Sequence, residues 1–141
     1  MARKSFVDTN ILIYAHDPST GVKYRRAQEL VDDLWATGTG VLSTQVLQEL
    51  CVNLRRKAKL PYSMNEMRSL IRDYKSWQVV VNNHESLLRA LEIEDRYQIS
   101  FWDALILQAA ESAGADVVYS EHLSAGQRYG EVEVVNPLRT R

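Results

Sequence analysis

The sequence of 141 residues has one cysteine, no apolar run long enough to span a membrane, and no marked excess of either charge. With Cys51 alone, no disulfide can form within the chain, and its place in a helical apolar pattern indicates a buried thiol. No Cys and His spacing typical of a zinc site is present. The apolar run before Asp8 is too short for a signal peptide, so we expect a cytoplasmic protein without a membrane segment.

The near absence of net charge also limits the function classes. Seventeen basic and eighteen acidic side chains give a formal charge of -1, which argues against a protein that coats nucleic acid by bulk electrostatics. An enzyme with clustered basic residues is still compatible with this balance. The length, together with the absence of linkers, repeats and low-complexity segments, predicts a single domain over residues 1–141.

The chain is organised around its first apolar segment. Phe6 and Val7 are typical of a short buried strand. Asp8 ends this strand, and Thr9 and Asn10, both common at helix N-termini, precede an apolar helical run. At the carboxyl end of a strand in a parallel sheet, Asp8 would lie where ligands and catalytic groups gather. A role limited to starting the helix, where a negative charge is favourable, explains the acid equally well at this stage.

Strands and helices alternate along the rest of the chain. The hydrophobic periodicity predicts helices over about 22–36, 44–59, 63–75, 86–97 and 101–113, and strands over 41–42, 77–81, 116–119 and 132–135. The glycines at 38 and 40 indicate a turn and lack the pattern of a nucleotide-binding loop. This alternation predicts a three-layer α/β/α sandwich with a parallel, Rossmann-like sheet.

Three further acids fall near the predicted strand ends, and each has a plainer interpretation. Glu49 lies about one and a half turns into its helix, where a solvent-exposed acid is the commoner finding. Asp103 follows Ser100 at the spacing of a capping box, in an otherwise apolar helix expected at the centre of the fold. Glu121 directly follows the strand that ends near Tyr119.

If these acids converge with Asp8, their mutual repulsion requires compensation by a cation. Carboxylate oxygens favour a hard ion, Mg²⁺ or Mn²⁺. Such a site suits phosphodiester hydrolysis, because the ion activates water and neutralises charge on the phosphate. The dense basic cluster at Arg55, Arg56 and Lys57 is either a solvated helix end or a contact for phosphates. The stripe of Met64, Met67 and neighbouring apolar residues indicates packing, although an exposed part of it would suit a partner's helix.

Four segments together resemble the PIN-domain ribonucleases, and more narrowly the VapC-type toxins of toxin–antitoxin pairs. They are Phe6 to Tyr14 (FVDTNILIY), Ser43 to Leu50 (STQVLQEL), Ser100 to Ile106 (SFWDALI) and Tyr119 to Gln127 (YSEHLSAGQ). Each motif alone is weak, but all four occur in the family's order and span the chain.

The resemblance implies an acidic site of Asp8, Glu49 and Asp103, with Asp8 and Asp103 as the direct metal ligands. Thr9, Asn10 and Ser120 match family positions that support the site by hydrogen bonds. The resemblance further implies a Mg²⁺-dependent endoribonuclease that acts on RNA, forms a homodimer, and is neutralised by a cognate, VapB-like antitoxin whose tail enters the cleft.

One position departs from the family pattern. The family usually has Thr/Ser-Glu-Asp-Leu near the end, so its fourth acid aligns with His122 and not with Glu121. Either residue is open as the occupant of that position, and a catalytic role for Glu121 is still expected. The departure also keeps alternatives open: a housekeeping or DNA-directed nuclease, or a PIN-like binding module that has lost its metal.

Overall fold

A six-stranded sheet with the order β3-β2-β1-β4-β6-β5 runs through the molecule. The computed structural model describes residues 3–56 and 61–139. The strands are β1 (Ser5–Val7), β2 (Gly40–Ser43), β3 (Gln78–Val80), β4 (Val117–Tyr119), β5 (Arg128–Tyr129) and β6 (Val132–Val135). All neighbouring strands pair in parallel except β5, which runs antiparallel to β6 at the edge.

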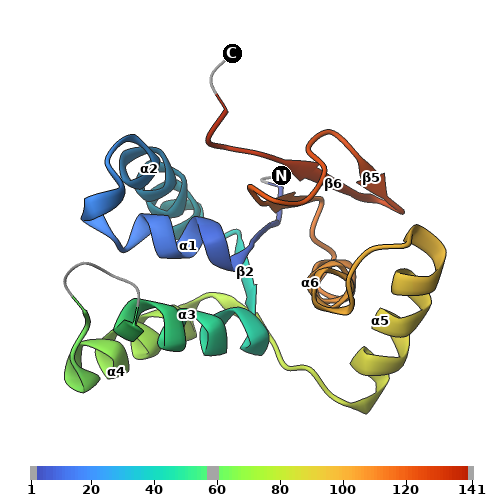
Figure 1. Ribbon diagram of the computed structural model, residues 1–141, viewed down its shortest axis with the longest axis horizontal. Helices are drawn as coiled ribbons and strands as arrows, with labels where there is room; N and C mark the ends of the chain where they lie inside the picture. Colours follow the sequence, from blue (N-terminus) through green and yellow to red (C-terminus); the bar gives the residue numbers. More distant parts are fainter. Residues whose placement is uncertain (1–2, 57–60, 140–141) are drawn as a thin grey trace.

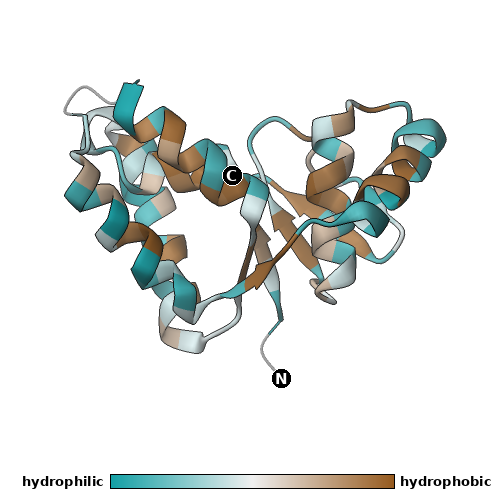
Figure 2. Cartoon of the chain, turned by 90° about the horizontal axis from the view of Figure 1, so that it is seen from below, coloured by the Kyte–Doolittle hydropathy of each residue, from teal (hydrophilic) through white to brown (hydrophobic). Residues whose placement is uncertain are grey.

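Helices cover both faces of this sheet (Figure 1). They are α1 (Thr9–Ala15), α2 (Val22–Thr37), α3 (Thr44–Arg56), α4 (Met64–Asp73), α5 (His84–Tyr97) and α6 (Phe101–Ser112), with short 3-10 turns at Pro18–Thr20 and Tyr74–Ser76. Helices α1 to α4 lie on one side, and α5 and α6 lie on the other (Figures 1 and 2). The predicted three-layer α/β/α sandwich is therefore confirmed.

The apolar pattern of the sequence decides what each element buries. Phe6 and Val7 of β1 are fully buried at the centre of the sheet. Every residue of α6 from Ala104 to Ala110 is buried, which agrees with a helix that is apolar nearly all round. None of the helices in the described residues is long and apolar enough to cross a membrane.

A close approach between Gly40 and Trp77 fixes the start of β2. A Cβ atom added at Gly40 would collide with the indole ring of Trp77, which is buried beside Tyr74 and Trp35. Gly38, two residues earlier, ends α2 in the left-handed conformation with φ 70°, which glycine adopts without steric cost. The predicted glycine turn thus has a steric reason.

Several predicted boundaries are wrong in detail. The helix expected over 63–75 ends as an α-helix at Asp73, and Ser63 is its N-cap in a capping box with Glu66. The helix expected from residue 86 begins at His84, because Asn83 caps it. Strand β5 was not predicted, and its antiparallel pairing at the edge makes the otherwise parallel sheet mixed there. The end of the helix predicted to run to residue 59 lies outside the described residues.

Candidate active site

Three carboxylates from distant parts of the chain line one pocket at the carboxyl edge of the sheet. Asp8 follows β1, Glu49 lies in α3, and Asp103 lies in the first turn of α6. The pocket has a volume of about 240 Å³, and Asn10 and His122 also line it. The predicted convergence of these three acids is therefore present in the structure.

Asp8 is almost completely buried, with 2% of its surface exposed. Its Oδ1 accepts the backbone N–H of Thr9 at 2.7 Å, and its Oδ2 accepts the hydroxyl of Ser120 at 2.8 Å. Burial raises the pKa of Asp8, and the nearby charge of Asp103 adds to this, while His122 and the hydrogen bonds oppose it. Asp8 does cap α1, as the simpler interpretation proposed, but a cap does not require this degree of burial.

Glu49 and Asp103 face Asp8 from opposite helices. The hydroxyl of Thr9 donates to Glu49 Oε1 at 2.7 Å. Partial burial raises the pKa of Glu49, and the charge of Asp8 raises it further against the effect of the Thr9 hydrogen bond. The backbone N–H of Asp103 donates to Ser100 Oγ at 3.1 Å, so Ser100 caps the helix while the Asp103 carboxylate is directed to His122.

His122 bridges two of the acids. Its Nε2 lies 2.8 Å from Asp103 Oδ1 and 3.6 Å from Asp8 Oδ2. On its other side, Nδ1 lies 2.7 Å from the Asn10 side-chain nitrogen. Of the two candidates for the fourth position, the ring of His122 lines the pocket, whereas the side chain of Glu121 does not.

Two influences on His122 oppose each other. Burial disfavours protonation, but the charges of Asp8 and Asp103 outweigh it and raise the pKa of His122. The amide of Asn10 favours the neutral ring. Its oxygen accepts the Glu121 backbone N–H at 3.0 Å, and its NH₂ group therefore faces Nδ1 of His122. An NH₂ donor requires a bare Nδ1, so the observed hydrogen bonds correspond to the neutral ring with its proton on Nε2.

Glu121 turns away from the pocket toward α1 and α2. Its Oε1 accepts the Tyr14 hydroxyl at 2.7 Å, and its Oε2 lies 2.7 Å from Lys23 Nζ. Burial alone would raise the pKa of Glu121, but the hydrogen bonds from Lys23 and Tyr14 outweigh it and lower that pKa. The sequence did not predict that Tyr14 and Lys23 contact Glu121. One signal for Tyr14 was available, because Asn10 and Tyr14 are four residues apart and so share one helix face toward this loop.

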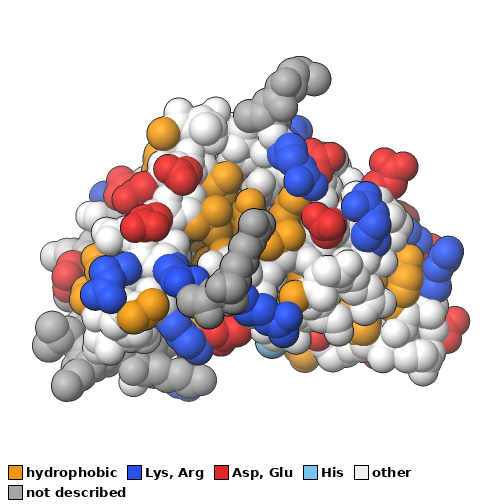
Figure 3. All heavy atoms as spheres, turned by 90° about the horizontal axis from the view of Figure 1, so that it is seen from above, with side chains coloured by type: hydrophobic (Ala, Val, Ile, Leu, Met, Phe, Trp, Pro, Cys, Tyr) orange, Lys and Arg blue, Asp and Glu red, His pale blue; other side chains and the backbone are white. Residues whose placement is uncertain are grey.

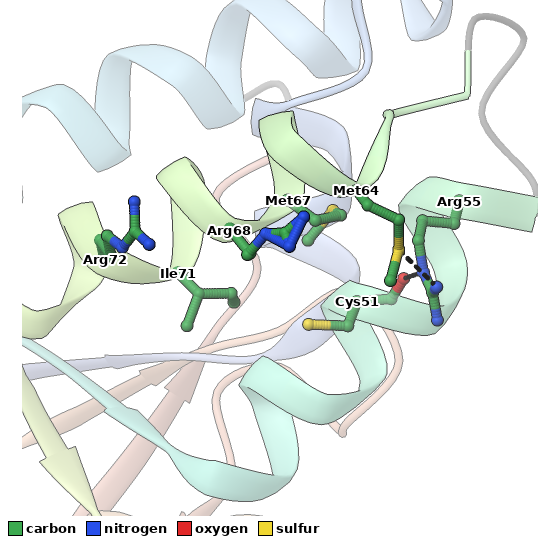
Figure 4. Close-up of a pocket in the computed structure, with 7 residues that line it drawn as sticks. All are labelled: Cys51, Arg55, Met64, Met67, Arg68, Ile71 and Arg72. Atoms are coloured by element: carbon green, nitrogen blue, oxygen red, sulfur yellow. Dashed lines mark hydrogen bonds between the residues drawn. The ribbon is translucent and has the colours of Figure 1, made fainter.

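The predicted basic residues lie elsewhere. Arg55 borders a larger groove of about 380 Å³ between α3 and α4, with a floor that includes Cys51, Met67 and Ile71. Figure 4 shows Arg55, Arg68 and Arg72 along this groove. Arg56 is exposed near the end of α3, and Lys57 lies outside the described residues. On the face in Figure 3, basic and acidic side chains are interspersed rather than gathered by sign.

Two pocket residues were not singled out from the sequence. Trp102 is 64% exposed although it lines the acid pocket, which is unusual for the largest apolar side chain. Gln45 is buried beside it, and its side-chain oxygen has no hydrogen-bond partner among the described residues. Helical periodicity does not single out either residue, because it does not distinguish an exposed first turn of a helix from a buried one.

The donor set fits a hard divalent cation in its chemistry. Asp8, Glu49 and Asp103 supply only oxygen. Burial, with a smaller contribution from the neighbouring carboxylates, raises the pKa of both Asp8 and Glu49, as expected for acids that a cation would hold ionised. Within residues 3–56 and 61–139, however, no three Asp, Glu, His or Cys side chains are grouped closely enough to hold an ion as they stand. The ring of His122 lies between two of the acids instead.

Comparison with solved structures places the fold among toxin–antitoxin proteins. A toxin–antitoxin complex from Klebsiella pneumoniae matches with a TM-score of 0.69 and 17% identity, covering 94% of this chain and 97% of that one. VapC20 of Mycobacterium tuberculosis, a toxin that cleaves the sarcin-ricin loop, matches with a TM-score of 0.65 and 21% identity over 84% and 90% of the two chains. DNA-bound VapBC from Salmonella typhimurium gives a TM-score of 0.63 and 18% identity over 94% and 97%.

Comparison with curated proteins gives no match. At these identities the solved structures establish the fold alone, whereas the family model covers most of the sequence. It matches residues 5–122, a segment that contains Asp8, Glu49, Asp103 and His122. The chain belongs to the PIN-domain family.

Proposed function

We propose that this protein is a metal-dependent endoribonuclease, that it acts as the toxin of a type II toxin–antitoxin pair, and that residues 1–141 form a single PIN domain. The observation that carries the proposal is the convergence of Asp8, Glu49 and Asp103 on one pocket at the carboxyl edge of the sheet. The family and the toxin–antitoxin neighbours support it.

In this proposal Asp8 and Asp103 hold the ion, Mg²⁺ or Mn²⁺, and Glu49 completes the acidic set. When bound, the ion would neutralise charge on the scissile phosphate and lower the pKa of a water molecule. Ser120 and the Thr9 backbone N–H fix the orientation of the Asp8 carboxylate. The Thr9 hydroxyl occupies Glu49 Oε1, and Oε2 accepts no hydrogen bond from the described residues, so it is the atom that would take up a proton.

An RNA substrate is supported by the exposed indole of Trp102 at the edge of the pocket. Proteins that recognise single-stranded RNA commonly stack unpaired bases on aromatic side chains. We assign Trp102 this role, with the stacked base next to the phosphate that is cut. The contribution of Arg55, Arg56 and Lys57 to RNA binding stays a prediction, because Arg55 lines the other groove.

A partner protein is supported by that second groove (Figure 4). Its apolar floor and its three arginines, Arg55, Arg68 and Arg72, suit an amphipathic helix with an acidic border. We propose that a VapB-like antitoxin supplies this helix, and that the toxin forms a homodimer. A peptide of this character should bind wild-type protein and bind less tightly to Arg68→Glu, while Arg96→Glu on α5 serves as the control.

Cleavage assays test the enzymatic proposal. Wild-type protein should cut single-stranded RNA only with added Mg²⁺ or Mn²⁺, and Asp8→Asn should lose at least about a thousandfold in rate. Asp116→Asn, an exposed acid at the amino end of β4, is the matched control. Preferential cleavage of DNA would favour the DNA-directed nuclease. RNA binding without cleavage under all metal conditions would favour the binding module.

A further inference from the structure

The ring of His122 fills the space between two acids that the proposed function assigns to a cation. Its Nε2 is 2.8 Å from Asp103 Oδ1 and 3.6 Å from Asp8 Oδ2. Because an N–H group directed at two carboxylates is a source of positive potential, the ring offsets part of their repulsion. About half of the His122 side chain is exposed, at 51%, so the ring has solvent beside it into which it can move.

A second contact fixes which ring nitrogen carries the proton. The Asn10 amide oxygen accepts the backbone N–H of Glu121 at 3.0 Å, and this sets the orientation of the amide. Its NH₂ group then donates to His122 Nδ1 at 2.7 Å. With Nδ1 serving as an acceptor, the neutral ring must carry its proton on Nε2, the nitrogen that faces the acids.

This tautomer has a direct consequence for metal binding. A histidine binds a metal ion through a nitrogen lone pair, but the lone pair of His122 is directed at Asn10 and its N–H is directed at the acids. In this arrangement the ring cannot serve as a ligand for an ion held by Asp8 and Asp103. The ring N–H instead bonds to Asp103 Oδ1, an oxygen of one of the two carboxylates that would hold the ion.

We infer that His122 is a displaceable hydrogen-bond donor that takes the place of the cation, that Asn10 is the positioning residue that holds it there, and that the ring competes with the metal. The inference rests on the proposed function for the assignment of the ion's place. In this arrangement His122 controls the affinity of the site for the metal.

Calorimetric titration with Mn²⁺ alone distinguishes a competitor from a ligand. Removing a competitor tightens binding, whereas removing a ligand weakens it. We expect His122→Ala to lower the Kd for Mn²⁺ on the order of tenfold, since a hydrogen bond to a charged group is lost from the metal-free state only. His84→Ala removes an exposed histidine on α5, whose side chain is 81% exposed, and should leave the Kd unchanged.

Two measurements without metal examine the same contact. In EDTA, His122→Ala should melt at a lower temperature than wild type, because Asp103 loses a hydrogen-bond donor and Asp8 loses the nearby ring. Long-range ¹H–¹⁵N spectra of the wild-type protein should show the His122 proton on Nε2 and a bare Nδ1 at neutral pH. This second measurement needs no variant and so does not depend on how well His122→Ala folds.

The outcomes separate this inference from the proposed function. Weaker Mn²⁺ binding by His122→Ala, unchanged affinity, or no binding by either protein would overturn the competition. A proton on Nδ1 would overturn the role given to Asn10. If His122→Ala binds Mn²⁺ more tightly and yet neither protein cleaves RNA, the inference stands and the proposed activity fails.

Discussion

His16 and His122 each lie beside an acid in the sequence, His16 before Asp17 and His122 after Glu121, yet their surroundings are opposite. His16 is largely buried, its Nε2 lies 2.6 Å from the Tyr74 hydroxyl, and burial lowers its pKa to about 4. His122 is half-exposed among carboxylates that raise its pKa. In both cases the sequence neighbour is not the residue that determines the charge state.

The regions around the two histidines differ in the same way. Around His16, Trp35, Tyr74 and Trp77 contact one another in tilted and edge-to-face pairs with centroids 4.6 to 5.3 Å apart. This cluster is held together by ring packing, although the buried indole N–H of Trp77 has no hydrogen-bond partner among the described residues. Around His122, burial and neighbouring charge raise the pKa values of Asp8 and Glu49. One region is stabilised by packing, and the other gathers buried acids in the way that is typical of functional sites.

The largest expected effect is in the charged region. Asp103→Asn should lower the rate of RNA cleavage at least about a thousandfold, because the acid set loses one of its two proposed metal ligands. Expression of the wild-type protein without a partner should harm cells, and Asp103→Asn or Glu49→Gln should relieve the harm.

The control for Asp103 is its cap. Ser100→Ala removes the hydroxyl that accepts the Asp103 N–H and should cost about 1 kcal/mol of stability while cleavage persists. If Asp103→Asn relieves toxicity only by lowering the amount of soluble protein, Asp103 acts through stability, and its proposed role as a metal ligand is not supported.

The next largest effect is expected on stability in acid, and it comes from the region around His16. His16 binds a proton in the unfolded chain near pH 6.5 but in the folded chain only near pH 4. The unfolded state therefore binds more protons between these values, and the free energy of unfolding should fall by about 3 kcal/mol as the pH drops through this window. Urea unfolding curves measured between pH 7 and pH 4 would show the loss.

Variants of the two histidines should change that curve in opposite directions. His16→Gln, which can still bond to the Tyr74 hydroxyl, should flatten it. The raised pKa of His122 gives stability that is present at low pH and lost as the pH rises through the folded value. His122→Ala should therefore steepen the loss in acid. Equal slopes for the two variants would contradict the contrast between the regions.

A smaller effect is expected at Trp102, the one large apolar side chain that links the charged pocket to solvent among the described residues. Trp102→Ala should raise the KM for single-stranded RNA on the order of tenfold, since stacking one base contributes about 1 to 3 kcal/mol. Trp102→Phe should retain most of the affinity. The melting temperature should change little, because the side chain is largely exposed. A large loss of stability would reassign Trp102 to packing.

The sequence was sufficient for the layers and for five of the six strands, because these depend on local patterns, whereas the resemblance to the PIN family selected the three acids. A buried strand that ends in Asp8, and a helix that begins at Asp103, are visible in the order of residues alone. The hydrogen bonds of the site are not. The contact between Asn10 and His122 joins positions 112 residues apart, and the choice between Glu121 and His122 depends on which way two adjacent side chains leave one strand.

The sequence alone also did not predict the contact of Glu121 with Lys23 and Tyr14, or the exposure of Trp102. Helical periodicity places an apolar residue on a face, but the partner that covers that face comes from elsewhere in the chain. Strand β5 was missed for a related reason, because two residues carry no period and only pairing with β6 defines them.

The smallest expected effect is at Glu121, and it contrasts with the effect expected at the adjacent residue, His122. Glu121→Gln removes the ion pair with Lys23 but leaves an oxygen that can accept the Tyr14 hydroxyl. Solvent screens an ion pair of this exposure, so RNA cleavage and Mn²⁺ affinity should each change by less than about threefold. His122→Asp, one residue away, should tighten Mn²⁺ binding because it replaces a donor by a ligand oxygen. Calorimetry and cleavage assays on both variants decide the matter: if Glu121→Gln abolishes metal binding while His122→Asp leaves it unchanged, then Glu121 is the fourth acid and the side chains exchange places when the ion binds.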